Sequence, residues 1–323
     1  MIPNKVIPHT LTARYDYLTS IRILDEQKCD VFQAKREEWL TYIKKSVDRV
    51  FYIISLLQGK KQLRILELGA SPYLITAAIV DLLQMSVTAV SGHDVIWPGQ
   101  DIDAGSRSRF IVAGDTTYPF QEHLFNVEKD IFPFADETFD LVLCNELIEH
   151  LLFNPTHLLC EINRVLIPGG KLILSTQPNI LYWRLAVQLF LNMTFEMPYS
   201  GNGPYGRHNR LFTPDELKVL AESNGFEVKM IKVQTFREIR SKSKLIHLLR
   251  QMTLLADWMF AYVPIKAIQK KAGENITLVC RKKCRGKPCY PLELYGSIYP
   301  EWLKAQGIHY VPEEIIVNKW IKR

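Results

Sequence analysis

The chain has 323 residues, of which 47% are hydrophobic and 23% are charged, and its formal net charge is +6. This composition is ordinary for a globular protein with a large core, and the small basic excess does not require an anionic partner. Charges interrupt every stretch of about 20 residues, which argues against a membrane-spanning helix. The cysteines are scattered and no apolar leader is visible, which predicts a reducing, cytoplasmic location.

The first 60 residues are expected to precede the main domain. Residues 1–28 show no regular apolar pattern and are predicted to form an irregular arm. From Asp30 to Leu57, apolar residues recur at helical spacing with charged residues between them. This pattern predicts a long amphipathic helix that packs beside a sheet.

A short apolar run at Leu63–Leu68 predicts a buried parallel strand. The small residues of the turn at 69–72 would let a ligand approach the backbone closely. A helix is predicted over Tyr73–Leu83, with Ser71 as its N-cap. Glu67 lies at the carboxyl end of the strand, the edge at which open α/β sheets bind ligands.

Two further strands are predicted at Val87–Val90 and His123–Val127. The segment between them is longer than an ordinary connection. Its Trp97-Pro98-Gly99 and Ala104-Gly105-Ser106 sequences are typical of loops. A short helix or strand near Phe110–Val112 remains open.

The run Phe132–Leu151 reads FPFADETFDLVLCNELIEHL and is the strongest signal in the chain. A turn precedes the continuous apolar stretch Phe139–Leu143, which predicts a strand covered on both faces. Asn145 and Glu146 would then emerge at the carboxyl edge of the sheet. A helix at His157–Leu166, a Gly-Gly turn and a strand at Lys171–Ser175 follow.

The remaining elements surround two insertions at 179–212 and 236–273. Thr213 is predicted to cap a helix over Glu216–Ser223. Strands are predicted at Phe226–Val233 and Asn275–Arg281. Both insertions contain apolar stretches, at 180–195 and 245–260, that suit a lid over a site. An ordinary core helix and peripheral contact with a membrane are the alternatives for both, and contact with another subunit is a further one for 245–260.

Three segments together resemble the class I S-adenosylmethionine (SAM)-dependent methyltransferases of the type 11/23-like domain. They are the Glu67-x-Gly69 turn, the 132–151 block and the stretch RVLIPGGKLILSTQPN. The resemblance implies a Rossmann-like, doubly wound, seven-stranded mixed α/β sheet, whose last strand is antiparallel and lies between the fifth and sixth. It divides the chain into an N-terminal arm and helix (1–60), a methyltransferase domain with helical lid insertions (61–281) and a C-terminal extension (282–323).

The resemblance also implies where SAM binds. SAM would be surrounded by the acid and turn at the first strand and by the ends of the second, third and fourth strands. The implied cofactor-binding residues are Glu67, Gly69, Ala70, Ser71, Ser91, Asp94, Asn126, Val127, Glu128, Cys144 and Asn145. Ser91 stands where the family carries an acid that binds the ribose hydroxyls, and Asp94 is the alternative acid.

Two histidines are the candidate catalytic bases, because a neutral imidazole suits proton transfer near pH 7. His150 ends the E-x-I-E-H-L sequence, and His208 lies in an RHNRxxT segment that resembles methyltransferases of glycan and cell-surface biosynthesis. The implied acceptor-binding residues are Glu146, His150, Tyr182, Arg207 and His208. A purely structural role remains the alternative for His150, and latching of the lid for 207–210.

The expected activity is methyl transfer from SAM to an oxygen or nitrogen of a small molecule or a glycan or cell-surface precursor. A non-catalytic scaffold on the same fold and an RNA methyltransferase are the alternatives; no RNA-binding module is recognisable, which argues against nucleic acid as a partner. No metal is expected, because the three cysteines near 280–289 lack a convincing fourth ligand. The oligomeric state is left open.

Overall fold

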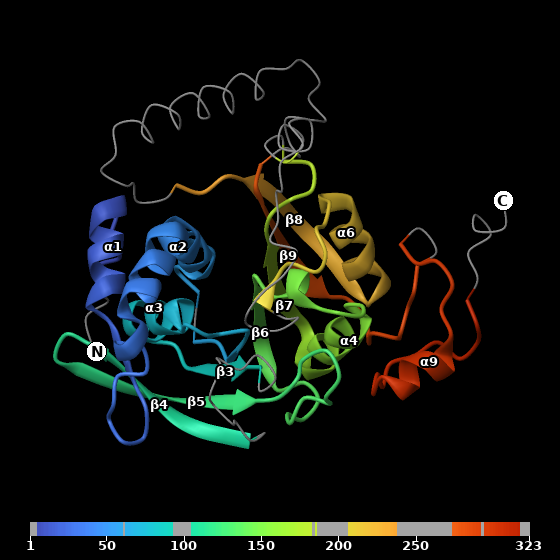
Figure 1. Cartoon of the computed structure of the whole chain (residues 1–323), viewed down its shortest axis with the longest axis horizontal. Coiled ribbons are helices and arrows are strands. Elements are labelled where there is room, and N and C mark those ends of the chain that lie inside the picture. The colour runs from blue at the N-terminus through green and yellow to red at the C-terminus, as the bar shows by residue number, and fades with distance from the viewer. Residues whose placement is uncertain are drawn as a thin grey trace, which may run out of the picture.

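The computed structural model describes residues 5–60, 62–92, 105–182, 185, 206–237, 273–291 and 294–316. Within them one nine-stranded sheet lies between two layers of helices (Figure 1). The strands are β1 (Arg22–Leu24), β2 (Ile65–Leu68), β3 (Val87–Ser91), β4 (Gly105–Ala113), β5 (Thr116–Leu124), β6 (Phe139–Asn145), β7 (Leu166–Thr176), β8 (Phe226–Gln234) and β9 (Asn275–Lys282). The helices are α1 (Leu11–Ser20), η1 (Gln33–Lys35), α2 (Arg36–Leu57), α3 (Leu74–Leu83), η2 (Ile148–His150), α4 (Thr156–Val165), α6 (Pro214–Ser223) and α9 (Pro300–Ala305).

The strand order is β1-β4-β5-β3-β2-β6-β7-β9-β8. The strands β5, β3, β2, β6 and β7 are parallel, and β9 runs antiparallel between β7 and β8. The seven strands from β5 to β8 therefore form the expected doubly wound mixed sheet, including its antiparallel last strand. The α/β fold class predicted from the sequence is confirmed.

Two strands lie beyond this core: β1 was not predicted, and β4 contains the Phe110–Val112 segment where a short helix or strand was left open. The segment expected to be a long connection contains β4, which pairs antiparallel with β5 through a turn at Gly114, and β1 extends the same edge. The strand predicted at His123–Val127 instead begins at Thr116 and ends at Leu124. Exposed and buried residues alternate along this edge hairpin, so it lacks the continuous apolar run that identifies the central strands.

The expectation of an irregular arm over residues 1–28 is wrong. Thr10 caps α1 by accepting a hydrogen bond from Ala13 N, and Leu18 and Ile23 are buried. The long helix begins at Arg36, after the short helix η1, rather than at Asp30. The sequence does not predict α1 because the helix is only weakly amphipathic: only one of its ten residues is buried.

Alternate strand residues supply the two halves of the core. On one face, Leu141 and Leu143 of β6 pack in the cluster that contains α2 and α3. On the other, Val142 and Cys144 pack in the cluster that contains α4 and α6. This alternation follows from the two-residue repeat of a strand. Both faces are covered, so the carboxyl edge of the parallel strands is where a site can open.

The C-terminal extension carries a small core of its own beside α4 (Figure 1). It consists of Tyr290, Ile298, Leu303 and Ile308. The Tyr310 hydroxyl donates to the Glu161 carboxylate at 2.7 Å, which ties this core to α4. Among the described residues, no helix has the length and apolar character needed to cross a membrane. Most of the stretches 180–195 and 245–260 lie outside the described residues.

Gly225, between α6 and β8, is held at φ +87°, and a Cβ added there would lie 2.9 Å from both Asn163 Nδ2 and the Cys284 carbonyl oxygen. Gly225→Ala should therefore cost about 2 kcal/mol more than Gly114→Ala, because overpacking adds to the backbone strain that both substitutions share. Gly114 is the matched control, with φ +59° and no atom within 4 Å of its added Cβ. Chemical denaturation measures both, and equal losses would contradict the predicted clash.

Candidate active site

The turn after β2 is built for close approach. Gly69 has φ +70°, and a Cβ added there would lie 3.3 Å from the Leu147 side chain. The Ala70 N–H donates to the Val90 carbonyl at 2.9 Å. The prediction of Ser71 as the N-cap is wrong: Tyr73, in the left-handed conformation, precedes α3, and Ser71 is exposed in the turn. The helix therefore begins at Leu74, two residues later than an N-cap at Ser71 would place it.

Glu67 is buried at the end of β2, with 3% of its surface exposed. One carboxylate oxygen accepts a hydrogen bond from the Thr76 hydroxyl on α3. Burial raises the pKa of Glu67 to about 8, and the Thr76 bonds only partly oppose that shift. In the folded chain Glu67 is therefore a protonated acid at neutral pH.

A carboxylate that sequence reasoning missed lies beside the end of β3. Glu122 of β5 is fully buried and accepts hydrogen bonds from Tyr73, from Arg107 at 2.5 Å and from Arg109 at 2.9 Å. Burial opposes ionisation, but these donors outweigh it and lower the pKa of Glu122. Ser91, at the end of β3, is buried next to this group. Asp94, the alternative acid, lies outside the described residues.

The residues after β5 mainly hold their own loop. The Asn126 side-chain oxygen accepts from the Glu128 N–H at 2.9 Å. The Glu128 carboxylate, fully buried, accepts from the backbone N–H groups of Leu152 and Phe153. Val127 packs in the core. These bonds fix the backbone of 126–128 against the segment that follows η2.

At the end of β6, Cys144 and Asn145 differ in what they offer a ligand. The Cys144 thiol is fully buried in the core, and burial raises its pKa, so it stays protonated. The Ser175 hydroxyl lies 3.1 Å from Asn145 Oδ1, and its single hydrogen is shared between this oxygen and a Glu146 carboxylate oxygen at 3.0 Å. Asn145 Nδ2 is buried and has no hydrogen-bond partner among the described residues. A buried donor without an acceptor is rare in folded proteins and marks a place where a ligand atom fits.

Glu146 is held by two partners. One carboxylate oxygen accepts from Arg49 of α2 at 3.1 Å and the other from the Ser175 hydroxyl at 3.0 Å. Its backbone is in the left-handed region, with φ +52°. The Arg49 side chain is 9% exposed and that of Glu146 is 12% exposed. This buried ion pair fastens α2 to the carboxyl edge of the sheet.

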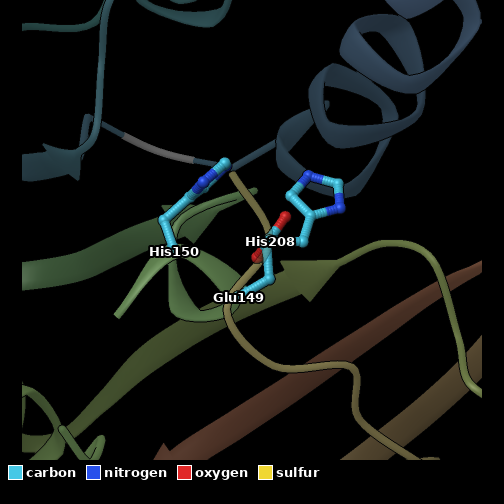
Figure 2. Close-up of side chains that lie close together, drawn as sticks. All are labelled: Glu149, His150 and His208. Atoms are coloured by element: carbon cyan, nitrogen blue, oxygen red, sulfur yellow. The ribbon is translucent and has the colours of Figure 1, made fainter. Parts of the chain in front are cut away.

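Glu149, His150 and His208 form a cluster next to this pair. One possible ligand atom of each lies within 4.8 Å of those of the other two. The imidazole rings of His150 and His208 meet edge to face, with centroids 4.9 Å apart. Figure 2 shows the Glu149 carboxylate between the two rings. The structure thus brings together the two histidines expected to act as bases, although they come from separate segments.

Glu149, which sequence reasoning missed as a site residue, is almost completely buried, with 1% of its surface exposed. Its Oε2 accepts from the Thr176 hydroxyl at 2.8 Å, and its Oε1 has no hydrogen-bond partner among the described residues. Burial and then the negative charge of Glu146 raise the pKa of Glu149. Its place one residue before His150 was the available signal.

Backbone contacts lock the segment of His208 onto η2. The Asn209 N–H donates to the Glu149 carbonyl, and the Asn209 side-chain amide donates to the His150 carbonyl, both at 2.8 Å. His150 Nδ1 lies 2.9 Å from the Arg207 carbonyl oxygen. A carbonyl only accepts, so Nδ1 carries a proton and the lone pair of a neutral ring resides on Nε2.

Arg207 and Tyr182, two of the residues expected to bind the acceptor, make their described contacts outside the cluster of Glu149, His150 and His208. The Arg207 guanidinium donates to the Asn209 side chain at 2.8 Å and so turns toward its own segment. Tyr182 is buried, with 3% exposed, where its N–H donates to the Asn179 carbonyl. The described contacts of 207–209 therefore match the latching role, while the two histidines remain at the sheet edge.

Several known proteins with sequence or fold similarity to this chain carry methyltransferase names. The human mitochondrial ubiquinone biosynthesis O-methyltransferase is 31% identical over 97 residues, and the bovine one 30%; the match covers 29% of this chain and 25% of each relative. A SAM-dependent methyltransferase structure from Thermotoga maritima aligns at TM-score 0.45 and 16% identity, covering 78% of this chain and 97% of that one. One from Archaeoglobus fulgidus aligns at TM-score 0.46 and 14% identity, covering 78% and 100%.

The family model for a methyltransferase domain matches residues 40–230, which is more than half of the chain. The matched range begins within α2 and ends within β8, so it includes the turn after β2, the end of β6 and the cluster of Glu149, His150 and His208. The chain therefore belongs to the methyltransferase domain family.

Proposed function

We propose that the chain is a SAM-dependent methyltransferase that methylates an oxygen or nitrogen of a small molecule or of a glycan or cell-surface precursor, and that this acceptor atom binds at Glu149, His150 and His208. The observation that carries the proposal is the convergence of two imidazoles and a buried carboxylate at the carboxyl edge of the sheet. The name of the human relative specifies O-methyl transfer, which supports a hydroxyl oxygen as the acceptor.

The residues at the ends of β2 and β6 fit the cofactor. Gly69 forms the positive-φ turn at the end of β2, and Asn145 Nδ2 is a buried donor in need of an acceptor. Bound SAM supplies a methyl group on a positively charged sulfur, which becomes a neutral thioether when the acceptor takes that methyl. The protein then contributes mainly alignment, since a reaction with a good leaving group gains most from proximity and orientation.

The histidines account for the acceptor proton. With Nδ1–H donated to the Arg207 carbonyl, the Nε2 lone pair of His150 can accept a proton from a hydroxyl or an ammonium group. The new carbon–oxygen bond forms as that proton moves to the imidazole, and water takes it from the imidazolium afterwards. When the imidazole becomes cationic, its charge favours the ionised form of the nearby Glu149 carboxyl, and the resulting ion pair stabilises the ring.

His150→Ala and His208→Ala should each lower kcat by about 10²- to 10⁴-fold, the usual contribution of a positioned base. The affinity for SAM, measured by calorimetry, should change little, because neither residue lies in the turn or strand ends assigned to the cofactor. His309→Ala is the control, since His309 is exposed in the C-terminal extension. Transfer of labelled methyl to candidate hydroxyl acceptors provides the rate, and full activity in both site variants would refute the proposed role.

A further inference from the structure

The cluster at Glu149, His150 and His208 has the composition of a metal site as well as that of an acid–base site. The ligand atoms of the three side chains are already within 4.8 Å of one another. Two ligands of one zinc ion lie at most about 4 Å apart, since zinc–nitrogen and zinc–oxygen bonds are about 2.0 to 2.2 Å long. Small side-chain movements would therefore bring the three atoms to bonding distance.

The buried carboxylate gives an independent reason to expect a cation. The Glu149 carboxylate points into the cluster (Figure 2), and its Oε1 is buried and has no hydrogen-bond partner among the described residues. A buried carboxylate oxygen without a partner is costly, and proteins normally satisfy it with a donor or a metal ion. Glu146 does not offer this compensation, because it is itself acidic and its oxygens already bind Arg49 and Ser175.

The surroundings also orient the histidine for a metal. The hydrogen bond from His150 Nδ1–H to the Arg207 carbonyl fixes the tautomer that leaves the Nε2 lone pair for a ligand bond. Metal-binding histidines almost always make such a bond with their second nitrogen. Asn209 binds the backbone of both Glu149 and His150, so the segment that carries His208 is held in place before any ion arrives.

We propose that Glu149, His150 and His208 bind a divalent cation, with Zn²⁺ favoured over Mg²⁺, and that the acceptor's reacting oxygen occupies the open fourth position. Two imidazoles and one carboxylate are a donor set that suits zinc, whereas magnesium prefers oxygen ligands alone. Three protein ligands with one open position are typical of catalytic zinc sites. When the ion is bound, the Nε2 lone pair of His150 is a ligand and cannot also accept a proton; the ion would instead lower the pKa of the acceptor hydroxyl, and water would take its proton. The position of the acceptor rests on the proposed function, while the ion site itself does not.

The test is calorimetry of the metal-stripped protein with Zn²⁺ alone, followed by the absorption spectrum with Co²⁺ as a visible probe. Wild-type protein should bind one equivalent of Zn²⁺ and bind Mg²⁺ much more weakly. His208→Ala should weaken Zn²⁺ binding by roughly 100-fold or more, because loss of a ligand exceeds the effect of losing an outer-shell contact. Zn²⁺ should raise the midpoint of thermal unfolding of the wild-type protein but not that of His208→Ala.

Two controls make the result decisive. Cys284→Ser/Cys289→Ser removes the exposed and half-buried thiols of the C-terminal extension, which are the competing zinc ligands, and should leave binding unchanged. Glu149→Gln changes no side-chain volume and should also weaken binding; if it fails to fold, His150→Ala replaces it. Unchanged Zn²⁺ affinity in His208→Ala, or loss of binding only in the double Ser variant, would overturn the site. Methyl transfer by a protein that binds no ion would refute this site while leaving the proposed function standing.

Discussion

Arg49→Met is expected to destabilise the protein by about 3 to 5 kcal/mol, the usual result of removing one partner of a buried ion pair. The Arg49 side chain donates to Glu146 at 3.1 Å and to the Tyr42 hydroxyl at 3.4 Å, in surroundings that leave it 9% exposed. Methionine keeps much of the volume but leaves the Glu146 carboxylate with Ser175 as its remaining partner. Urea denaturation followed by circular dichroism measures the loss.

The same substitution at an exposed pair separates the effect of burial from that of charge. Arg285 lies 3.4 Å from Asp136 with 80% of its side chain exposed, so Arg285→Met should cost only about 0 to 1 kcal/mol. Adding Glu146→Gln to Arg49→Met should restore part of the stability, because the buried negative charge is then gone. If the double variant is as unstable as the sum of the two single variants, the two side chains act independently and the ion pair is not the cause.

The central strands were predictable because each contains a continuous apolar run, Leu141–Cys144 in β6 and Leu172–Leu174 in β7. Residues 139–145 and 166–176 lie in the middle of the sheet, where both faces are covered, and their sequence shows it. The Thr213 N-cap was equally readable, and the structure contains the full capping box with Glu216. The hairpin β4–β5 could not be predicted, because its strands lie toward one edge of the sheet and alternate between polar and apolar residues.

The site was predictable where one residue carries the signal and not where partners come together only in the fold. His150 and His208 stood out because each is a titratable group in a segment that resembles methyltransferases, E-x-I-E-H-L and RHNRxxT. Nothing local indicated that Arg49, in the middle of a long helix, would meet Glu146, or that Arg107 and Arg109 would surround Glu122. These pairs form because of how α2 and the β4–β5 hairpin pack against the sheet. The spacing of residues along the sequence does not indicate that packing.

Glu67→Gln should make the protein more stable at alkaline pH, and the gain should grow as the pH rises. Burial raises the pKa of Glu67 to about 8 from the ordinary 4.5, so between these values the folded chain keeps a proton that the unfolded chain has lost. The folded state then binds more protons, and its stability falls by about 1.4 kcal/mol per pH unit. The glutamine side chain of the variant cannot ionise, so this loss is removed.

The free energy of unfolding should therefore rise in the variant, relative to wild type, by about 3 kcal/mol between pH 5 and pH 8. Denaturation curves at several pH values measure this difference, which cancels the contributions of all other titrating groups. A glutamine at this position can still accept the hydrogen bond from Thr76, so the local contact is largely preserved.

Glu161→Gln is the matched comparison, because Glu161 is a fully buried acid whose pKa moves the other way. Burial would raise that pKa, but the hydrogen bonds from Arg164, Tyr310 and the Phe132 N–H outweigh it, so the pKa of Glu161 is lowered. Its ionised form stabilises the fold at neutral pH, and that contribution disappears on acidification. Glu161→Gln should thus be less stable than wild type at pH 7, with a deficit that shrinks as the pH falls below 4.5. Opposite pH profiles for the two variants would show that burial alone does not set the charge of a carboxyl group in this core, whereas parallel profiles would contradict the raised pKa of Glu67.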